Sequence, residues 1–335
     1  MSIHERLGYG FPWEHTIIQL VNMNSTCYIN SVLQSLFNLP SIQNYLEDVS
    51  KKISELNMNI ESTLFGLFVK IYIDSQRAPQ NEVWYEPNYF LDKFFSVPSI
   101  FERYQMGDSN EFFLTILDRF DEDIMSINRI INTNQNSPRN DPEYNKNNPI
   151  RSFSSFFYFQ LQNKSNPNFP EFRDPAPIEL FDLILIRPNN EGTEKAIQEF
   201  LTSPFHRRFL NLPEIFVVNI NSFCFGDDGR FYKLFDKTPI SRQLELSTKW
   251  YNDEHCGNEE KAVYDLIATV VHNGTDFDSG HFITVFKACD RIIVGDDANF
   301  WGLNDDQLNR FIYQNEIPGN EHCSTIYSMF YQKRM

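Results

Sequence analysis

The stretch NMNSTCYINSVLQSL, residues 22–36, decides the fold of this chain. Apolar side chains in and just beyond it recur at the spacing of one helix face: Ile29, Val32, Leu33, Leu36 and Phe37. This spacing predicts an amphipathic helix over residues 25–39, ended by Leu39-Pro40. Cys27 stands in the first turn of that helix and, at about 100° per residue, points away from the apolar stripe.

A cysteine at this point of a helix is suited to nucleophilic chemistry. The unpaired N–H groups of the first turn and the positive end of the helix dipole favour a thiolate over a thiol. The polar residues before it, among them Asn22 and Asn24, suit a tight turn, and a side-chain amide there would donate a hydrogen bond to an oxyanion. A lone cysteine is also often a small buried hydrophobic residue, so the helix alone leaves both interpretations open.

A cysteine nucleophile needs a base, and two of the 7 histidines have an informative setting. His272 and His281 bracket HNGTDFDSGH between two strand-like runs, and Gly280 permits close approach of the backbone. Asp296 and Asp297 end the next strand-like run, RIIVGDD. Adjacent antiparallel strands would bring an aspartate beside His281, where it would orient the imidazole and favour its charged form. A helix-borne cysteine with a sheet-borne histidine and aspartate suits a papain-like pair of lobes around a cleft.

Composition narrows the range of partners. The 335 residues carry a formal net charge of −16, with 41% hydrophobic and 15% aromatic residues, which is typical of a globular protein. Nucleic acid is not expected as a partner, because phosphate binding requires a basic surface. The negative charge favours a basic partner or serves solubility alone, and composition does not separate these two roles.

The five cysteines are scattered and never form a C-x-x-C pair: Cys27, Cys224, Cys256, Cys289 and Cys323. This argues against a disulfide framework and a structural zinc site, so we expect no cofactor and no metal. The start of the chain, MSIHERLGYGFPWEH, lacks the pattern of a signal peptide, and no apolar run reaches about 18 residues. We therefore expect a monomeric cytoplasmic or nuclear protein without membrane contact.

Helical periodicity dominates the first part of the chain, up to residue 130. Its clearest stripe lies in GDSNEFFLTILDRFDEDIM, residues 107–125. Asp108 is the predicted N-cap of this helix, and Glu111 completes a capping-box pattern three residues later.

The second part of the chain has a different residue composition and pattern. Asn and Pro dominate residues 131–149, which predicts a loop. Beyond it, runs of β-branched and aromatic residues predict strands, with one short helix at TEKAIQEFL, residues 193–201. The sequence therefore predicts an α+β protein in which residues 1–130 form a helical lobe and residues 150–335 a β-rich lobe.

Six blocks, in order from about Leu20 to Lys333, resemble those of the ubiquitin-specific protease family of deubiquitinating enzymes. NMNSTCYINSVLQSLFNLP is similar to the cysteine box, MGDSNEFFLTILDRF to the second block, LPEIFVVNINSFCF to the LP block and VVHNGTDFDSGHFITVFK to the histidine box. GDDANF and IYSMFYQK are similar to the two closing blocks. The resemblance implies a single catalytic domain over residues 1–335, with a papain-like fold of helical thumb, β-rich palm and β fingers.

The resemblance also implies catalytic roles. Cys27 would be the nucleophile, His281 the general base and then the acid, and Asp296 the residue that orients His281. Asp297 would assist or substitute for Asp296. Asn22 would stabilise the oxyanion.

Four further residues match positions that receive the C-terminal tail of ubiquitin, Leu-Arg-Leu-Arg-Gly-Gly. Asp108 and Glu111 would form charge-assisted hydrogen bonds with the arginines of the tail. His272 and Phe282 match tail-contacting positions of the histidine box. The implied partners are ubiquitin and ubiquitinated proteins, and the implied reaction is thiol-dependent hydrolysis after the terminal glycine of ubiquitin.

The chain also departs from the family pattern. The fingers of most members bind zinc through two C-x-x-C pairs, whereas here residues 153–199 are left to form metal-free fingers. Other departures lie around the tail channel: Asn24, Gly107, Asn110, Ser222 and Gly295. They motivate one alternative, a catalytically weak ubiquitin-binding scaffold. A protease for a ubiquitin-like modifier and a general papain-like peptidase are further alternatives.

Overall fold

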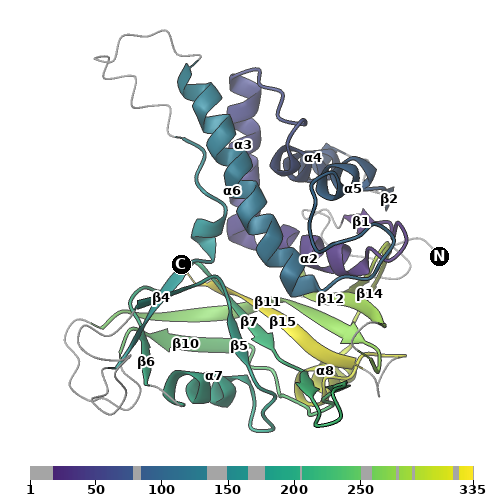
Figure 1. Ribbon diagram of the computed structural model, residues 1–335, viewed down its shortest axis with the longest axis vertical. Coiled ribbons are helices and arrows are strands. Elements are labelled where there is room, and N and C mark those ends of the chain that lie inside the picture. The colour runs from purple at the N-terminus through teal and green to yellow at the C-terminus, as the bar shows by residue number, and fades with distance from the viewer. Residues whose placement is uncertain are drawn as a thin grey trace.

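A computed structural model describes residues 18–77, 84–133, 149–164, 178–203, 206–249, 259–276, 279–288, 291–319 and 324–334. Within these residues a group of helices covers one face of an eight-stranded sheet, and two further helices lie on its other face (Figure 1). The structure is therefore of the α+β class, as the sequence predicts.

The helices of the first group are α2 (Cys27–Phe37), α3 (Pro40–Glu55), α4 (Leu64–Arg77), α5 (Asn88–Phe95) and α6 (Ser109–Thr133). The predicted helix over residues 25–39 is two residues shorter at each end. At its start Ser25 has a left-handed φ of 60°, and beyond its end Pro40 opens α3 at the N1 position. The predicted loop over residues 131–149 begins late, since α6 continues to Thr133. The rest of that loop, residues 134–148, lies outside the described residues.

The large sheet has the order β14-β13-β12-β11-β15-β7-β5, and β10 also pairs with β11. All its pairs are antiparallel except the parallel pair of β5 and β7. Its strands are β5 (Ile184–Ile186), β7 (Ile215–Ile220), β10 (Gln243–Ser247), β11 (Lys261–Asn273), β12 (His281–Ala288), β13 (Arg291–Asp296), β14 (Asn299–Gly302) and β15 (Ser324–Lys333).

Both faces of this sheet are buried. Along β7, alternate side chains join two separate cores: Val217 packs toward α2–α6, whereas Val218 packs with α7 (Thr193–Thr202) and α8 (Asp305–Gln314). This explains why β7 is almost continuously apolar in sequence and why β15 is buried along nearly its whole length.

Smaller elements flank the sheet. The strands β3 (Phe159–Asn163), β4 (Ile178–Phe181) and β6 (Arg207–Phe209) form a three-stranded sheet after a short 3₁₀ turn, η2 (Ser154–Phe156). Of these strands, β3 and β4 lie within residues 153–199, the range expected for the fingers, and β6 lies beyond it. A hairpin joins β8 (Phe223–Phe225) to β9 (Phe231–Lys233), and β1 (Gln19–Leu20) pairs in parallel with β2 (Trp84–Tyr85).

The surroundings of α2 correct one expectation. Every residue of α2 is buried, and Cys27 is only 3% exposed, so the cysteine does not face away from the core. The helix lies between the other helices and the sheet (Figure 1), which leaves it no solvent face. Several of its polar side chains form hydrogen bonds, such as that between the hydroxyls of Ser35 and Thr284 (3.1 Å). The amphipathic pattern therefore marks an apolar face and a hydrogen-bonded face, both inside the protein.

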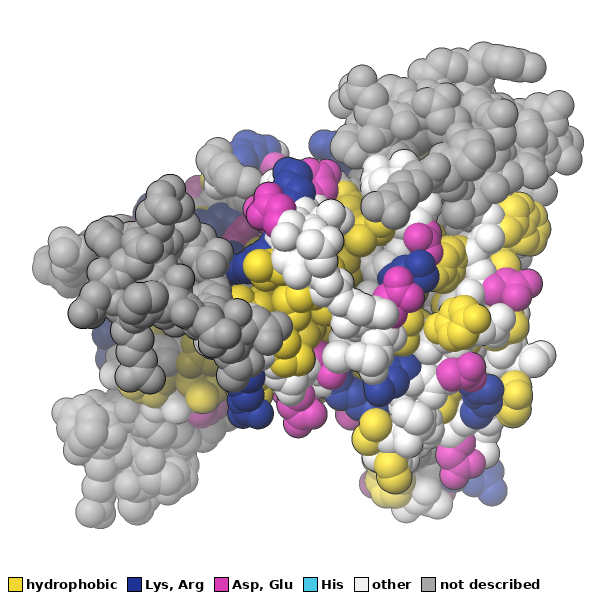
Figure 2. All heavy atoms as spheres, turned by 90° about the horizontal axis from the view of Figure 1, so that it is seen from above, with side chains coloured by type: hydrophobic (Ala, Val, Ile, Leu, Met, Phe, Trp, Pro, Cys, Tyr) yellow, Lys and Arg dark blue, Asp and Glu magenta, His cyan; other side chains and the backbone are white. Residues whose placement is uncertain are grey.

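Figure 2, which views the molecule from above the helices, shows acidic and basic side chains interspersed on that face, without a field of one sign. No helix of the described residues is long and apolar enough to cross a bilayer.

Candidate active site

The turn before α2 fixes the position of the cysteine. Asn24 and Ser25 both have left-handed backbone conformations, with φ of 63° and 60°. The side-chain oxygen of Asn22 accepts a hydrogen bond from the backbone N–H of Thr26 (3.1 Å). Asparagine is among the residues that tolerate this conformation best. The turn therefore delivers Cys27 as the first residue of α2, where backbone N–H groups have no partner within the helix.

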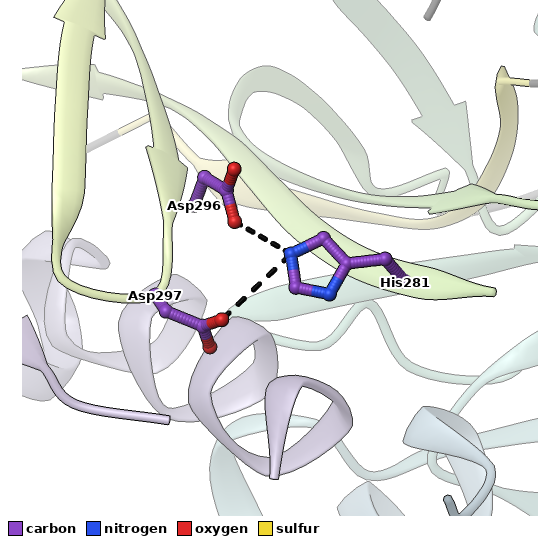
Figure 3. Close-up of side chains that lie close together, drawn as sticks. All are labelled: His281, Asp296 and Asp297. Carbon is purple, nitrogen blue, oxygen red and sulfur yellow. Dashed lines mark hydrogen bonds and ion pairs between the residues drawn. The ribbon is translucent and has the colours of Figure 1, made fainter. Parts of the chain in front are cut away.

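The predicted base and its orienting residue meet on neighbouring strands. His281 opens β12 and Asp296 closes β13. Nε2 of His281 lies 2.5 Å from Oδ1 of Asp296 and 3.7 Å from Oδ2 of Asp297, so both carboxylates approach one ring nitrogen (Figure 3). Cys27 acts on the same imidazole and favours its charged form, and Nδ1 is the nitrogen that the two carboxylates leave for it.

These contacts stabilise the charged imidazole. The pKa of His281 is raised to about 10, mainly by the hydrogen bond with Asp296 and next by that with Cys27, and these two effects outweigh desolvation. At neutral pH an imidazolium therefore lies beside the thiol. A thiolate paired with an imidazolium is the reactive form of a cysteine nucleophile.

The raised pKa of His281 makes the stability of the fold depend on pH. Because the folded-state pKa of about 10 exceeds the ordinary 6.5, the stabilisation is complete below about pH 6.5 and is lost as the pH rises to about 10. We expect Asp296→Asn to lower the Tm most at about pH 6 and progressively less toward about pH 9. Both side chains are 35% exposed, so solvent weakens the effect.

Thermal melts of Asp296→Asn and of the exposed control Asp227→Asn, recorded across this range, test the assignment. The control should show no pH-dependent difference from the parent protein. A Tm loss for Asp296→Asn that is the same at every pH would contradict it.

Asp297 has a different environment from Asp296. It lies in the turn after β13 with φ of 52°, and its side chain is 12% exposed. Oδ2 accepts a hydrogen bond from Nδ2 of Asn22 (2.9 Å), and Oδ1 accepts one from Nδ2 of Asn30 (2.8 Å). Burial raises the pKa of Asp297, although these two hydrogen bonds oppose the rise. Asp297 therefore anchors the amide of Asn22, whose second N–H has no acceptor among the described residues.

Asn30 is a residue that the sequence did not single out. It is 3% exposed on α2, and besides Asp297 its Nδ2 contacts the carbonyl oxygens of Leu20 (3.3 Å) and Val21 (3.4 Å). It thereby ties the strand before Asn22 to the turn that carries Asp297. The sequence signal of this role is an asparagine placed within an apolar helical pattern.

The residues of Figure 3 also have the side-chain chemistry of metal ligands. One ligand atom each of His281, Asp296 and Asp297 lies within 4.8 Å of the others. However, His281 is paired with Asp296, and both oxygens of Asp297 accept hydrogen bonds from amides. A cation would have to displace these hydrogen bonds, so the arrangement favours acid–base chemistry.

Three of the four residues predicted to receive a peptide tail line one pocket of about 220 Å³: Asp108, His272 and Phe282. The pocket lies between the start of α6 and strands β11, β12 and β15. Its other walls include Phe223 and Tyr327, which the sequence did not single out. Glu111 is exposed and is not among the lining residues.

The position of Asp108 allows both of its predicted roles, as the N-cap of α6 and as a carboxylate of the tail pocket. Its Oδ1 caps α6 by accepting hydrogen bonds from the backbone N–H groups of Asn110 (2.7 Å) and Glu111 (3.0 Å), which confirms the predicted N-cap. Its Oδ2 accepts a hydrogen bond from the hydroxyl of Tyr327 and lies on the pocket side. Glu111 thus contributes its backbone to the cap, while Asp108 carries the carboxylate of the pocket.

Two departures from the family pattern have a steric reason. A Cβ on Gly107 would lie 2.8 Å from the ring of Tyr28, which stacks on Phe101 at 5.7 Å between centroids. A Cβ on Gly295 would lie 2.7 Å from the ring of Phe300. In both places an aromatic ring from elsewhere fills the space of the missing side chain, so the packing is preserved.

Comparison with known proteins gives relatives over the whole chain. The chain is 24% identical over 352 residues to "Ubiquitin carboxyl-terminal hydrolase 12" of Salmo salar, covering 97% of this chain and 91% of the relative. It is 20% identical over 371 residues to "Ubiquitin carboxyl-terminal hydrolase 10" of Saccharomyces cerevisiae, covering 89% of this chain but only 45% of that relative.

Solved structures share the fold. The SAGA DUB module of Ubp8, Sgf11, Sgf73 and Sus1 contains a chain that matches all of this chain and 70% of its own length, with a TM-score of 0.69 and 17% identity. The same module bound to monoubiquitin matches 96% of this chain and 70% of the other, with a TM-score of 0.68 and 16% identity.

The fold and the site together define a cysteine hydrolase with a helix-borne thiol and a sheet-borne base. The sequence pattern described as "Ubiquitin carboxyl-terminal hydrolase" matches residues 18–331. The chain belongs to that family and is a cysteine-type deubiquitinase, as the resemblance in the sequence implied.

Proposed function

We propose that this protein cleaves peptide and isopeptide bonds after the terminal glycine of ubiquitin, with Cys27 as nucleophile. The observation that carries the proposal is the convergence of Cys27, His281 and Asp296 next to a pocket lined by Asp108. The pocket supplies a place for the tail of the substrate. The paired thiol and imidazole supply the reactive groups.

The first half of the reaction forms an acyl-enzyme. The sulfur of Cys27 attacks the carbonyl carbon of the terminal glycine, and the carbonyl oxygen becomes an oxyanion. The second N–H of Asn22 and the backbone N–H groups at the start of α2 stabilise that charge. The imidazolium of His281 then donates its proton to the departing amine, and the C–N bond breaks.

The second half regenerates the enzyme. His281, now neutral, accepts a proton from a water molecule, which attacks the thioester carbonyl. The C–S bond breaks, ubiquitin leaves with a free carboxylate, and the thiolate and imidazolium are restored. Asp296 keeps Nε2 occupied throughout, so Nδ1 is the nitrogen that exchanges the proton.

The pocket supports a tail of alternating leucine and arginine. Its walls are mostly apolar and aromatic, which suits leucine, and Asp108 places one carboxylate among them. Solved structures of the same fold contain bound monoubiquitin and bound ubiquitin aldehyde, which supports ubiquitin as the substrate here.

A ubiquitin whose C-terminus carries a thiol-reactive electrophile tests the proposal, read by intact mass. We expect one ubiquitin adduct on the parent protein and none on Cys27→Ala. The described residues contain one other free cysteine, Cys224, which is exposed. The matched control Cys224→Ala should therefore still form the adduct.

The other outcomes discriminate the alternatives. Ubiquitin binding without an adduct would favour a ubiquitin-binding scaffold. An adduct with a SUMO electrophile but none with ubiquitin would favour a protease for a ubiquitin-like modifier. A cytoplasmic or nuclear location, a monomeric state and the absence of nucleic-acid and membrane partners stay predictions from the sequence.

A further inference from the structure

Lys233 is a buried cation near the strand ends that carry His272 and His281. It ends β9 and is 9% exposed. Its Nζ lies 2.9 Å from Nδ1 of His272, 3.1 Å from the carbonyl oxygen of His272 and 2.6 Å from that of Gly274. An ammonium group has three N–H donors and no acceptor, so Lys233 can only donate to these atoms.

The contact with Lys233 determines the protonation of His272. Because an ammonium group only donates, Nδ1 of His272 must accept, and the proton of the neutral ring then lies on Nε2. Burial, and next the charge of Lys233, lower the pKa of His272 to about 4. His272 is therefore neutral at physiological pH, with one tautomer selected.

The same contacts join two strands at a narrow neck. A Cβ on Gly274 would lie 2.8 Å from Cα of Gly280, and a Cβ on Gly280, whose φ is 134°, would lie 2.6 Å from Nε2 of His272. The chain leaving β11 and the chain entering β12 therefore close around His272. Asn273 pairs with His281 across these strands, and His281 is the first residue of β12. The neck therefore fixes the position of His281.

His272 also forms a wall of the tail pocket. Its ring lies 4.7 Å from that of Phe282 and 6.2 Å from that of Phe223, between centroids, and all three residues line the pocket. Phe223 belongs to β8, the partner strand of β9 in the hairpin that carries Lys233. The hairpin and the neck thus meet in one wall, with Lys233 behind it.

We propose that Lys233 is a positioning residue for the hydrolysis. By bonding His272 and Gly274, it joins the β8–β9 hairpin to the neck before His281 and presents His272 as the Nε2–H tautomer in a preformed wall of the tail pocket. Lys233 is not among the residues that line the pocket, so it acts through His272. The inference rests on the proposed function, because it assumes that the pocket receives the ubiquitin tail.

Ubiquitin binding tests the role without requiring catalysis. In a Cys27→Ala background, Lys233→Met is expected to raise the Kd for ubiquitin about tenfold, because the pocket loses its preorganisation. The matched control is Lys237→Met, since Lys237 donates to only one carbonyl oxygen, that of Ser324 at 3.5 Å. Its Kd should stay within about twofold of the parent value. An unchanged Kd for Lys233→Met would overturn the proposal.

Kinetics separate positioning from general destabilisation. With Cys27 intact, Lys233→Met should raise KM for a ubiquitin C-terminal substrate more than it lowers kcat. The rate at which a small chloroacetamide alkylates Cys27 should stay the same. Equal losses in both reactions would show that the substitution only weakens the fold, which overturns the positioning role. An unreactive Cys27 in the parent protein would instead refute the proposed function.

The tautomer can be read in the parent protein, independently of whether a variant folds. With ¹⁵N-labelled histidine, we expect His272 to carry its proton on Nε2 and to remain neutral at about pH 6. Lys233→Met should raise the pKa of His272 and allow the other tautomer. A parent His272 protonated on Nδ1, or charged at this pH, would overturn the proposal.

Discussion

Replacing His281 with Gln is expected to lower kcat/KM for ubiquitin substrates by about 10³-fold or more. Glutamine keeps a polar side chain beside Asp296 but cannot accept and return a proton at neutral pH. It also removes the cation that lies beside the thiol of Cys27. Hydrolysis of a fluorogenic ubiquitin C-terminal substrate measures the loss.

Two further measurements locate the effect of His281→Gln in the chemistry. The Kd for ubiquitin should stay close to the parent value, because His281 does not line the tail pocket. Alkylation of Cys27 by a small chloroacetamide should become slower than in the parent protein, because the cation that stabilises a thiolate is gone. The exposed His206 supplies the control variant His206→Gln, which should keep full activity. A His281→Gln variant with near-parental kcat would exclude His281 as the base.

Replacing Asn22 with Ala is expected to lower kcat by about 10²–10³-fold, with little change in KM. The amide of Asn22 is held in place by Asp297, so its second N–H is available to a charge that develops only during the reaction. An interaction made only in the transition state lowers kcat when it is removed. Steady-state kinetics of the same ubiquitin substrate separate the two constants.

The double variant tests how Asn22 is supported. If Asp297 acts through Asn22, the double variant should be only slightly less active than Asn22→Ala alone, because the support that Asp297 gives is already lost. Fully additive losses would show that Asp297 works directly on His281, across the 3.7 Å between them. The exposed Asn88 provides a neutral control, Asn88→Ala.

The pairing of His281 with Asp296 could be predicted from sequence because it depends on local patterns. Two strand-like runs joined by a short connection pair as neighbours, and their ends then lie together. The helix start at Cys27 follows from spacing and turn residues in the same way. The prediction of an α+β architecture depends on these signals and on the change from helical to strand-like patterns after residue 130.

The residues that the sequence missed depend on tertiary contacts. Lys233, Asn30 and Tyr327 lie on three different elements and reach their partners over 39, 267 and 219 positions of the chain. No local period reports such distances. A capping-box pattern likewise shows that a helix starts but not how its carboxylates meet a ligand, so the contact of Glu111 with the ubiquitin tail stays a prediction.

The complete burial of α2 determines how heat would inactivate this enzyme. Local opening of a protein starts where few apolar contacts hold the chain, at loops and edges, whereas the best-buried helices open only with the whole molecule. The nucleophile lies on such a helix. Loss of activity on heating should therefore coincide with global unfolding, so that residual activity reports the fraction of molecules that are still folded.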